Sequence, residues 1–265
     1  MASWRLLFVL LLSFVFFTAC GRRYGELQRL DLTVPGKTNR LLNAPAAFLT
    51  GVDRLNTYSR YSDGRPDAPT TRTIVLHQTE PELYRSYDSY GNWVEFDLDL
   101  EAGLKITRGH NTAYGSWIVF HDPLLFAPSR MEQNSRFEQK TAFTTWADSW
   151  TTRTGQLAMA TWFAGVEDID TDLGRLEQCV RVDSAFTATL FFGLPFNATV
   201  NQRQWIHADY GEVVRDLDGS YGVIGLPVKA FTSRHVISAS RELTEGEAHD
   251  LLTQRPRRPS TKRLR

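Results

Sequence analysis

The sequence predicts a mainly β protein, built as an antiparallel β-sandwich or an incomplete barrel with a few peripheral helices; an α+β fold is the alternative. Many short runs of β-branched and aromatic residues are separated by Gly, Pro, Asn and Asp, which are turn residues. Several of these runs alternate apolar and polar residues with the period of two that strands require. Because regular helical segments do not follow the strand-like runs, a doubly wound parallel sheet is not expected.

The first part of the chain after residue 20 contains one predicted strand, one helix and a long loop. Residues 30–34 alternate and are followed by Pro35-Gly36, so a strand is expected to end there. Asn43 can cap a helix and Pro45 is tolerated in its first turn, so a short helix is predicted over residues 45–55. Residues 58–73 are rich in Ser, Asp, Gly, Pro and Thr, a composition typical of a loop.

The stretch from residue 73 to residue 121 carries clear strand signals. In one run the acidic residues recur at every second position, which places them on one face of a strand and the apolar residues on the other. The carboxylates are Glu95, Asp97 and Asp99, and the apolar residues are Phe96, Leu98 and Leu100. Lys105 and Arg108 of the following strand are placed to offset the facing acids. The expected strands are residues 73–77, 84–90, 93–100, 104–108 and 116–121.

The following stretch is harder to assign. Ser129 and Glu132 have the spacing of a capping box, which predicts that a helix starts there. Residues 143–150 and 156–163 are rich in apolar and aromatic side chains, which indicates buried elements without distinguishing strand from helix. Further strands are expected at residues 179–182, 185–192, 204–207, 228–231 and 236–239.

Two signals near the C-terminus are more specific. Asp218-Gly219 lies between two apolar runs and predicts a hairpin with a type I′ turn joining residues 212–217 to residues 220–224. Thr244 and Glu247 form a second capping box, which predicts a helix that ends before Pro256.

Composition bounds the class of protein. The chain has 265 residues, with 30 basic and 30 acidic side chains, so its charge gives no steering toward nucleic acid, and no nucleic-acid partner is expected. The sequence has no phosphate-binding glycine-rich loop and no Gly-x-Ser-x-Gly motif, and no cofactor is expected. Of the two cysteines, Cys179 is expected to be a small buried hydrophobic residue, so the fold does not depend on a disulfide.

The N-terminus has the three parts of a secretory signal peptide. Arg5 is followed by an uncharged apolar run over residues 6–17 and then by the small residues Thr18 and Ala19. The run is shorter than the roughly 20 apolar residues of a transmembrane helix. Two basic residues at positions 22 and 23 also oppose the orientation that Arg5 would set for an uncleaved anchor.

The tetrapeptide Phe17-Thr18-Ala19-Cys20 resembles the lipobox of bacterial lipoproteins, with Phe17 where that family most often has Leu. The resemblance implies cleavage before Cys20, lipidation of the Cys20 sulfur and acylation of the new amino terminus. Gly21 permits, by the same resemblance, transfer to the outer membrane of enteric bacteria. The resemblance covers only the first 20 or so residues, and no family is recognised for the rest of the chain. An ordinary cleaved signal peptide with an incidental cysteine is the alternative.

These observations predict four segments. Residues 1–19 form the signal peptide, residues 20–40 the lipidated N-terminus and tether, and residues 41–254 a single β-rich globular domain. Residues 255–265 form a disordered tail with six basic residues, which either contacts an anionic surface or is simply solvated.

The sequence contains candidate metal ligands and candidate catalytic histidines. Asp168, Asp170 and Asp172 alternate as in a calcium loop, but glycine is at position seven and Cys179 stands at position twelve, so a solvated acidic loop is favoured and no metal site is expected. The pairs His110-Asn111 and His121-Asp122 are the histidines most suggestive of catalysis. The six histidines lack the spacing of a helical zinc site.

Carbohydrate chemistry has two candidate signals. Glu95, Asp97 and Asp99 could line a cleft, as a β-sandwich glycosidase requires, although a wet outer sheet face is favoured. A platform of tryptophans could stack on sugars, although core packing is favoured. These tryptophans are Trp93, Trp117, Trp146, Trp150, Trp162 and Trp205.

Together these patterns predict an exported protein of the bacterial cell envelope, held at the membrane through lipidated Cys20 and facing the periplasm or the exterior. Its expected role is that of a binding or structural module, because no catalytic machinery is detectable. No catalytic, cofactor-binding or metal-binding residue is assigned. The alternative is a secreted, carboxylate-dependent hydrolase acting on glycans.

Overall fold

The structure is a computed structural model that describes residues 41–62, 65–112, 115–147, 150–191, 195–223 and 226–253. The signal peptide, Cys20, the strand expected at residues 30–34 and the basic tail at residues 255–265 lie outside the described residues.

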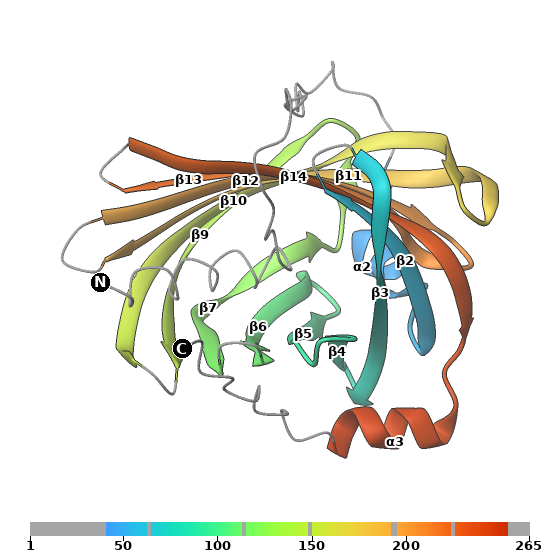
Figure 1. The fold of residues 1–265 in the computed structure, drawn as a ribbon, viewed down its shortest axis with the longest axis horizontal. Coiled ribbons are helices and arrows are strands. Elements are labelled where there is room, and N and C mark those ends of the chain that lie inside the picture. Colours follow the sequence, from blue (N-terminus) through green and yellow to red (C-terminus); the bar gives the residue numbers. More distant parts are fainter. Residues whose placement is uncertain are drawn as a thin grey trace.

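The described residues form a closed antiparallel barrel, whose strands wrap around helix α2 in Figure 1. Going round the barrel, the order is β10, β11, β12, β13, β14, β2, β3, β4, β5, β6, β7 and β9. The elements are β1 (Leu41–Leu42), α2 (Ala44–Leu49), β2 (Arg54–Ser62), β3 (Arg65–Glu80), β4 (Leu83–Asp88), β5 (Trp93–Asp99), β6 (Gly103–Asn111), β7 (Ser116–Pro128), β8 (Met131–Glu132), β9 (Arg136–Ala147), β10 (Trp150–Thr171), β11 (Gly174–Phe191), β12 (Pro195–His207), β13 (Gly211–Val223), β14 (Leu226–Glu242) and α3 (Glu245–Thr253).

Most neighbours in the barrel are also neighbours in the chain, joined as hairpins. Two pairings differ: β7 pairs with β9, and β14 pairs with β2 to close the ring. The short strands β1 and β8 pair with each other outside this order. The predicted mainly β, antiparallel class is confirmed, and the barrel is complete, so the ring has no edge strand.

The core lies inside the barrel, because every second side chain of each strand points inward. Its main cluster combines buried residues from β5–β7 and β9–β14, including Val94, Ile118, Phe143, Phe186 and Phe231. The elements at residues 143–150 and 156–163, whose type the sequence left open, are parts of β9 and β10.

The hairpin predicted at Asp218-Gly219 is wrong, because β13 continues straight through these residues. Gly219 pairs with Val200 on one side and Phe231 on the other. A Cβ atom on Gly219 would lie 2.4 Å from Cζ of Phe231. The glycine therefore leaves room for the inward-pointing ring of Phe231 on the next strand. In the sequence, a glycine required for this packing has the same pattern as a glycine required for a turn.

The predicted N-terminal helix is present but shorter than expected. Asn43 caps it by accepting a hydrogen bond from the backbone N–H of Ala46 at 3.1 Å, and Pro45 lies in the first turn as predicted. The helix ends at Leu49, and Gly51 packs so closely on Tyr210 that a Cβ atom would lie 2.8 Å from the Tyr210 carbonyl oxygen. This close approach ends the helix before residue 55.

The loop expected at residues 58–73 is instead most of β2 and β3. Tyr58 pairs with Arg72 across this hairpin and with Ile237 on the closing side of the ring. Polar residues occupy both faces here, because part of the interior is polar, so the apolar alternation that marks a strand is missing.

Of the two capping boxes, only the second caps a helix. The Thr244 hydroxyl accepts from the Glu247 N–H at 3.3 Å, and the Glu247 carboxylate accepts from the Thr244 N–H at 3.1 Å. The helix predicted at Ser129 is wrong: Glu132 belongs to β8, and the Ser129 hydroxyl donates to the Glu101 carbonyl oxygen at 2.7 Å. Among the described residues, neither helix has the length and apolar character needed to cross a membrane.

Candidate functional site

A cavity of about 100 Å³ lies inside the barrel, next to helix α2. The helix packs against β6 and β7 and also against β12 and β13, so it fills the space between the barrel walls. The cavity has an apolar wall formed by Phe48, Ile74, Leu76, Phe96, Leu104 and Phe126. The polar wall is formed by Asn56, Tyr58, Gln204, Glu212 and Arg215, and Gly51 and Ser86 complete the lining.

Part of the cavity lining is reachable from solvent. Leu76, Ser86 and Phe96 come from neighbouring strands and are only half-buried, although they point to the inner side of the barrel. Three aromatic rings meet here: the ring centroids of Phe48 and Phe126 are 4.9 Å apart, and those of Phe96 and Phe126 are 5.9 Å apart. These contacts fix the apolar wall in place.

The polar wall centres on Glu212. Its carboxylate accepts a hydrogen bond from Nη2 of Arg215 at 2.6 Å and another from Nε2 of Gln204. The Tyr58 hydroxyl donates to the Glu212 backbone oxygen at 2.7 Å. Burial, with a smaller contribution from the Glu212 charge, raises the pKa of Tyr58 above its ordinary value, so this hydroxyl stays protonated and continues to donate.

Behind the polar wall lies a fully buried ion pair. Nη2 of Arg72 is 2.8 Å from Oδ2 of Asp88, and both side chains are almost inaccessible, at 2% and 1% exposure. The Asp88 carboxylate also accepts from the side-chain amide of Asn92 and from the backbone N–H groups of Tyr90 and Asn92, each at 2.9 Å. Burial lowers the pKa of Arg72 to about 10, against the opposing effect of Asp88, and the guanidinium stays charged at neutral pH.

His235 lies beside this pair. It is 1% exposed and stands opposite Arg215 on one neighbouring strand and Arg60 on the other. Neither ring nitrogen has a hydrogen-bond partner among the described residues. Burial, followed by the charges of Arg72, Arg215 and Arg60, lowers the pKa of His235 well below its ordinary value. The imidazole is therefore neutral at pH 7.

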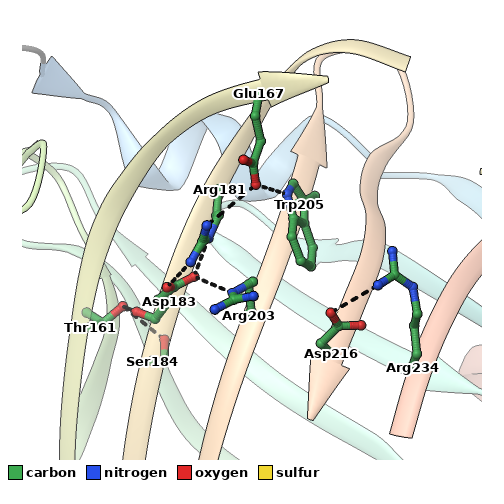
Figure 2. A network of polar contacts seen from close by, with 9 residues as sticks. All are labelled: Thr161, Glu167, Arg181, Asp183, Ser184, Arg203, Trp205, Asp216 and Arg234. Atoms are coloured by element: carbon green, nitrogen blue, oxygen red, sulfur yellow. Dashed lines mark hydrogen bonds and ion pairs between the residues drawn. The ribbon is translucent and has the colours of Figure 1, made fainter. Parts of the chain in front are cut away.

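Figure 2 shows a second polar network, whose positions on the strands alternate with those of Gln204, Arg215 and His235 and therefore face the outer side of the barrel. Asp183 is 1% exposed and accepts two hydrogen bonds from Arg181, at 3.0 and 2.8 Å. Cross-strand pairing extends this network over the next three strands. Asp183 pairs with Arg203 on β12, Arg203 with Asp216 on β13, and Asp216 with Arg234 on β14. Glu167 accepts from the Trp205 indole at 2.5 Å, and three guanidinium groups lie 5.9 Å from the Trp205 ring. Three arginines thus face three carboxylates, an arrangement that ties strands together.

The three carboxylates expected to line a glycan cleft do not converge. Glu95 is buried between Arg85 and Arg108, each 2.6 Å away, and Asp97 is exposed. Burial alone would raise the pKa of Glu95, but the hydrogen bonds from Arg108 and Arg85 lower it. Hydrogen bonds from Lys105 and from two backbone N–H groups lower the pKa of Asp99 to about 2. The expected pairing with Lys105 and Arg108 is present, whereas a glycosidase acid needs a raised pKa.

The histidine pairs are also separated in space. His110 is buried, with its ring centroid 4.6 Å from that of Trp117, while His121 is exposed and its Nε2 lies 2.7 Å from the Thr144 hydroxyl. Asp122 is exposed next to His121 and supplies its backbone oxygen to the Thr141 hydroxyl at 2.7 Å.

The aspartates of the acidic loop lie at the tip of the β10–β11 hairpin. Asp168 is 3.0 Å from Arg175, and Asp172 accepts from the Ser59 hydroxyl at 2.8 Å. Among the described residues there is no group of three or more potential metal ligands. Cys179 is fully buried, as expected, and burial raises its pKa to about 11.

The tryptophans divide into two groups, and the side chain of Trp150 lies outside the described residues. Trp162 and Trp205 are buried, whereas Trp93, Trp117 and Trp146 are partly exposed. Trp117 and Trp146 face each other on adjacent strands, with ring planes 5° apart and centroids 6.2 Å apart. The Trp117 ring also lies 5.3 Å from that of Trp93 and 4.6 Å from that of His110, between ring centroids, so it packs among other rings.

The cavity was not identified by sequence reasoning. Its polar wall comes from positions such as Tyr58, Gln204 and Arg215, which are separated in the chain and meet only when the ring closes. One signal was available: inward positions of β2 and β14, such as Asn56, Arg60 and His235, are polar within otherwise strand-compatible segments.

Comparison with known proteins gives three similar solved structures. No protein-family model and no curated protein matches the chain. A proposed exported protein with a YmcC-like fold from Bacteroides fragilis is 12% identical, with a TM-score of 0.37 over 72% of this chain and 96% of that one. A proposed lipoprotein from Parabacteroides distasonis is 10% identical, with a TM-score of 0.39 over 76% of this chain and 100% of that one. The hypothetical lipoprotein YmcC of Escherichia coli is 8% identical, with a TM-score of 0.37 over 76% of this chain and 91% of that one.

Proposed function

We propose that this protein is an exported, lipid-anchored binding protein of the bacterial cell envelope, which holds a small ligand inside its barrel. Two independent features support the two halves of the proposal. The signal peptide and Cys20 support the anchor, and the cavity beside α2 supports the binding role.

The observation that carries the binding role is the division of the cavity into an apolar and a polar wall. Ligand sites in proteins are concave and largely apolar, with a few polar groups that orient the ligand. Here Phe96 and Phe126 face a space whose other side holds Glu212 and Arg215. Protein interiors are close-packed and contain few voids larger than a water molecule, so an open space with these two walls favours a binding role. The glycan-hydrolase alternative lacks such support, because Glu95, Asp97 and Asp99 do not share a site.

The anchor is tested by labelling cells with radioactive palmitate and measuring the intact mass of the protein from the membrane fraction. We expect label and lipid mass on a chain that begins at Cys20, because a lipobox cysteine is modified before cleavage. Cys20→Ala is expected to lose the label, while Cys179→Ala, which removes the buried cysteine, keeps it. An unlabelled wild-type protein that is recovered outside the membrane fraction would contradict the anchor.

The binding role is tested with cyclopentane derivatives small enough for the cavity, followed by saturation-transfer NMR. We expect transfer from the wild-type protein to at least one of cyclopentanol, cyclopentanecarboxylate and cyclopentylammonium. Ser86→Phe should abolish it, because the added ring occupies the cavity from β4. Thr187→Phe places the same ring on an exposed position of β11 and should leave binding unchanged. Equal transfer in the wild type and Ser86→Phe would contradict binding in the cavity.

A further inference from the structure

We infer that the ligand of this cavity is a small uncharged amphiphile, with an apolar body and one hydroxyl or amide head group that meets the Arg215–Glu212 pair. This inference rests on the proposed binding function and specifies the chemistry of the ligand.

The polar groups of the cavity wall differ in how open they are to a ligand. Asn56 and Tyr58 are already used: the Asn56 amide donates to the Tyr210 carbonyl oxygen at 2.8 Å and accepts from the Ser240 hydroxyl at 2.6 Å. The Tyr58 hydroxyl donates to the Glu212 backbone. Arg215 and Glu212 are the more accessible members of the wall, with side chains 17% and 15% exposed. The head group of the ligand is therefore expected to contact the ion pair between Arg215 and Glu212.

The two accessible side chains of the polar wall carry opposite charges. The guanidinium of Arg215 and the carboxylate of Glu212 are 2.6 Å apart, so the accessible part of the wall is a neutral pair with a donor beside an acceptor. A hydroxyl or an amide offers both an acceptor to Arg215 and a donor to Glu212. A carboxylate attracted to Arg215 would be repelled by the adjacent Glu212, and an ammonium attracted to Glu212 would be repelled by Arg215. The pair therefore offers a charged head group little net attraction to offset its loss of hydration. Uncharged head groups that donate and accept are therefore preferred.

The shape and volume of the cavity limit the size of the ligand body. The rings of Phe48, Phe96 and Phe126 form a tilted aromatic wall opposite the ion pair, which suits a compact apolar body. An engineered apolar cavity of about 150 Å³ holds a benzene molecule. A space of about 100 Å³ therefore takes a body of about five or six heavy atoms rather than a long acyl chain.

The experiment compares the dissociation constants of cyclopentanol, cyclopentanecarboxylate and cyclopentylammonium by NMR titration at pH 7.5. We expect cyclopentanol to bind at least about fivefold more tightly than either charged analogue. Glu212→Gln keeps the shape of the side chain but leaves the Arg215 charge unmatched. This variant should therefore bind cyclopentanecarboxylate about tenfold more tightly than the wild type does. Glu167→Gln makes the same change in the outer network and should leave all three constants unchanged.

The outcomes separate the two proposals. If a charged analogue binds the wild type as tightly as cyclopentanol, and Ser86→Phe abolishes this binding, the ligand class is wrong and the binding function stands. An unchanged carboxylate affinity in a folded Glu212→Gln variant would also overturn the ligand class. If Glu212→Gln does not fold, the wild-type comparison alone decides. If no probe shows binding that depends on Ser86, the binding function fails as well.

Discussion

Replacing Asp88 by Ala is expected to reduce the free energy of unfolding by about 3–5 kcal/mol, the usual cost of removing one partner of a buried ion pair. Asp88 is 1% exposed, receives Arg72 at 2.8 Å and accepts three further hydrogen bonds that shape the β4–β5 turn. The loss leaves the Arg72 charge in the interior without this carboxylate. For a domain of this size, the midpoint of thermal unfolding should fall by roughly 6–20 °C.

The measurement is urea unfolding at pH 7.5, followed by tryptophan fluorescence. Asp97→Ala is the matched control, because Asp97 is exposed on the adjacent strand β5, and its substitution should change the free energy by less than about 0.5 kcal/mol. A loss below about 1 kcal/mol in Asp88→Ala would show that the turn and the interior do not depend on this carboxylate.

Acid is expected to destabilise the protein through His235. In the native state the pKa of His235 is lowered, so below pH 6.5 the native protein binds fewer protons at this residue than the unfolded chain does. Stability is therefore fully present above pH 6.5 and is lost as the pH falls, by about 1.4 kcal/mol for each pH unit until the native residue also titrates. The charged groups around the imidazole are Arg60, Arg72, Arg215, Asp88 and Glu212.

The free energy of unfolding is to be compared at pH 7.5 and pH 5.0. We expect the difference between the two values to shrink by about 2 kcal/mol in His235→Gln, because the glutamine has no proton to gain. His121→Gln removes an exposed histidine and should keep the wild-type pH dependence. An unchanged pH dependence in His235→Gln would contradict a lowered pKa of this imidazole in the native barrel.

Two signals that act over three residues were read correctly from the sequence, whereas signals that depend on distant strands were not. Asn43 and the Thr244–Glu247 box cap their helices through contacts only three residues apart. The Ser129–Glu132 spacing has the same local form as the second capping box, but there Glu132 pairs with Leu41 in the β1–β8 pair and no helix forms. Gly219, in contrast, has its role decided by Phe231, a residue on the neighbouring strand. A glycine that faces an aromatic ring and a glycine that makes a turn have the same local pattern, so the hairpin prediction failed.

The candidate site follows the same rule. The alternation from Glu95 to Asp99 correctly indicated a strand and its basic partners, but the pairing with Arg85 and Arg108 makes those carboxylates structural. The cavity depends on Arg215 and Tyr58 meeting across strands β13 and β2, which are not sequential neighbours. The periodicity of a single segment cannot predict that these two residues lie close together, because their proximity depends on closure of the barrel.

Closure of the ring has a consequence for the folding pathway. Asn56 on β2 and Ser240 on β14 are 184 residues apart, yet they share a hydrogen bond across the seam. Contacts this distant in the chain form late, because local hairpins cost less chain entropy. Until then both seam strands are open edges, which can pair with other copies and aggregate. Arginines stand on both strands of the seam, at positions 54, 60, 234 and 241. Their like charges oppose pairing of one seam strand with the same strand of another molecule, so the unfinished barrel has electrostatic protection against self-association.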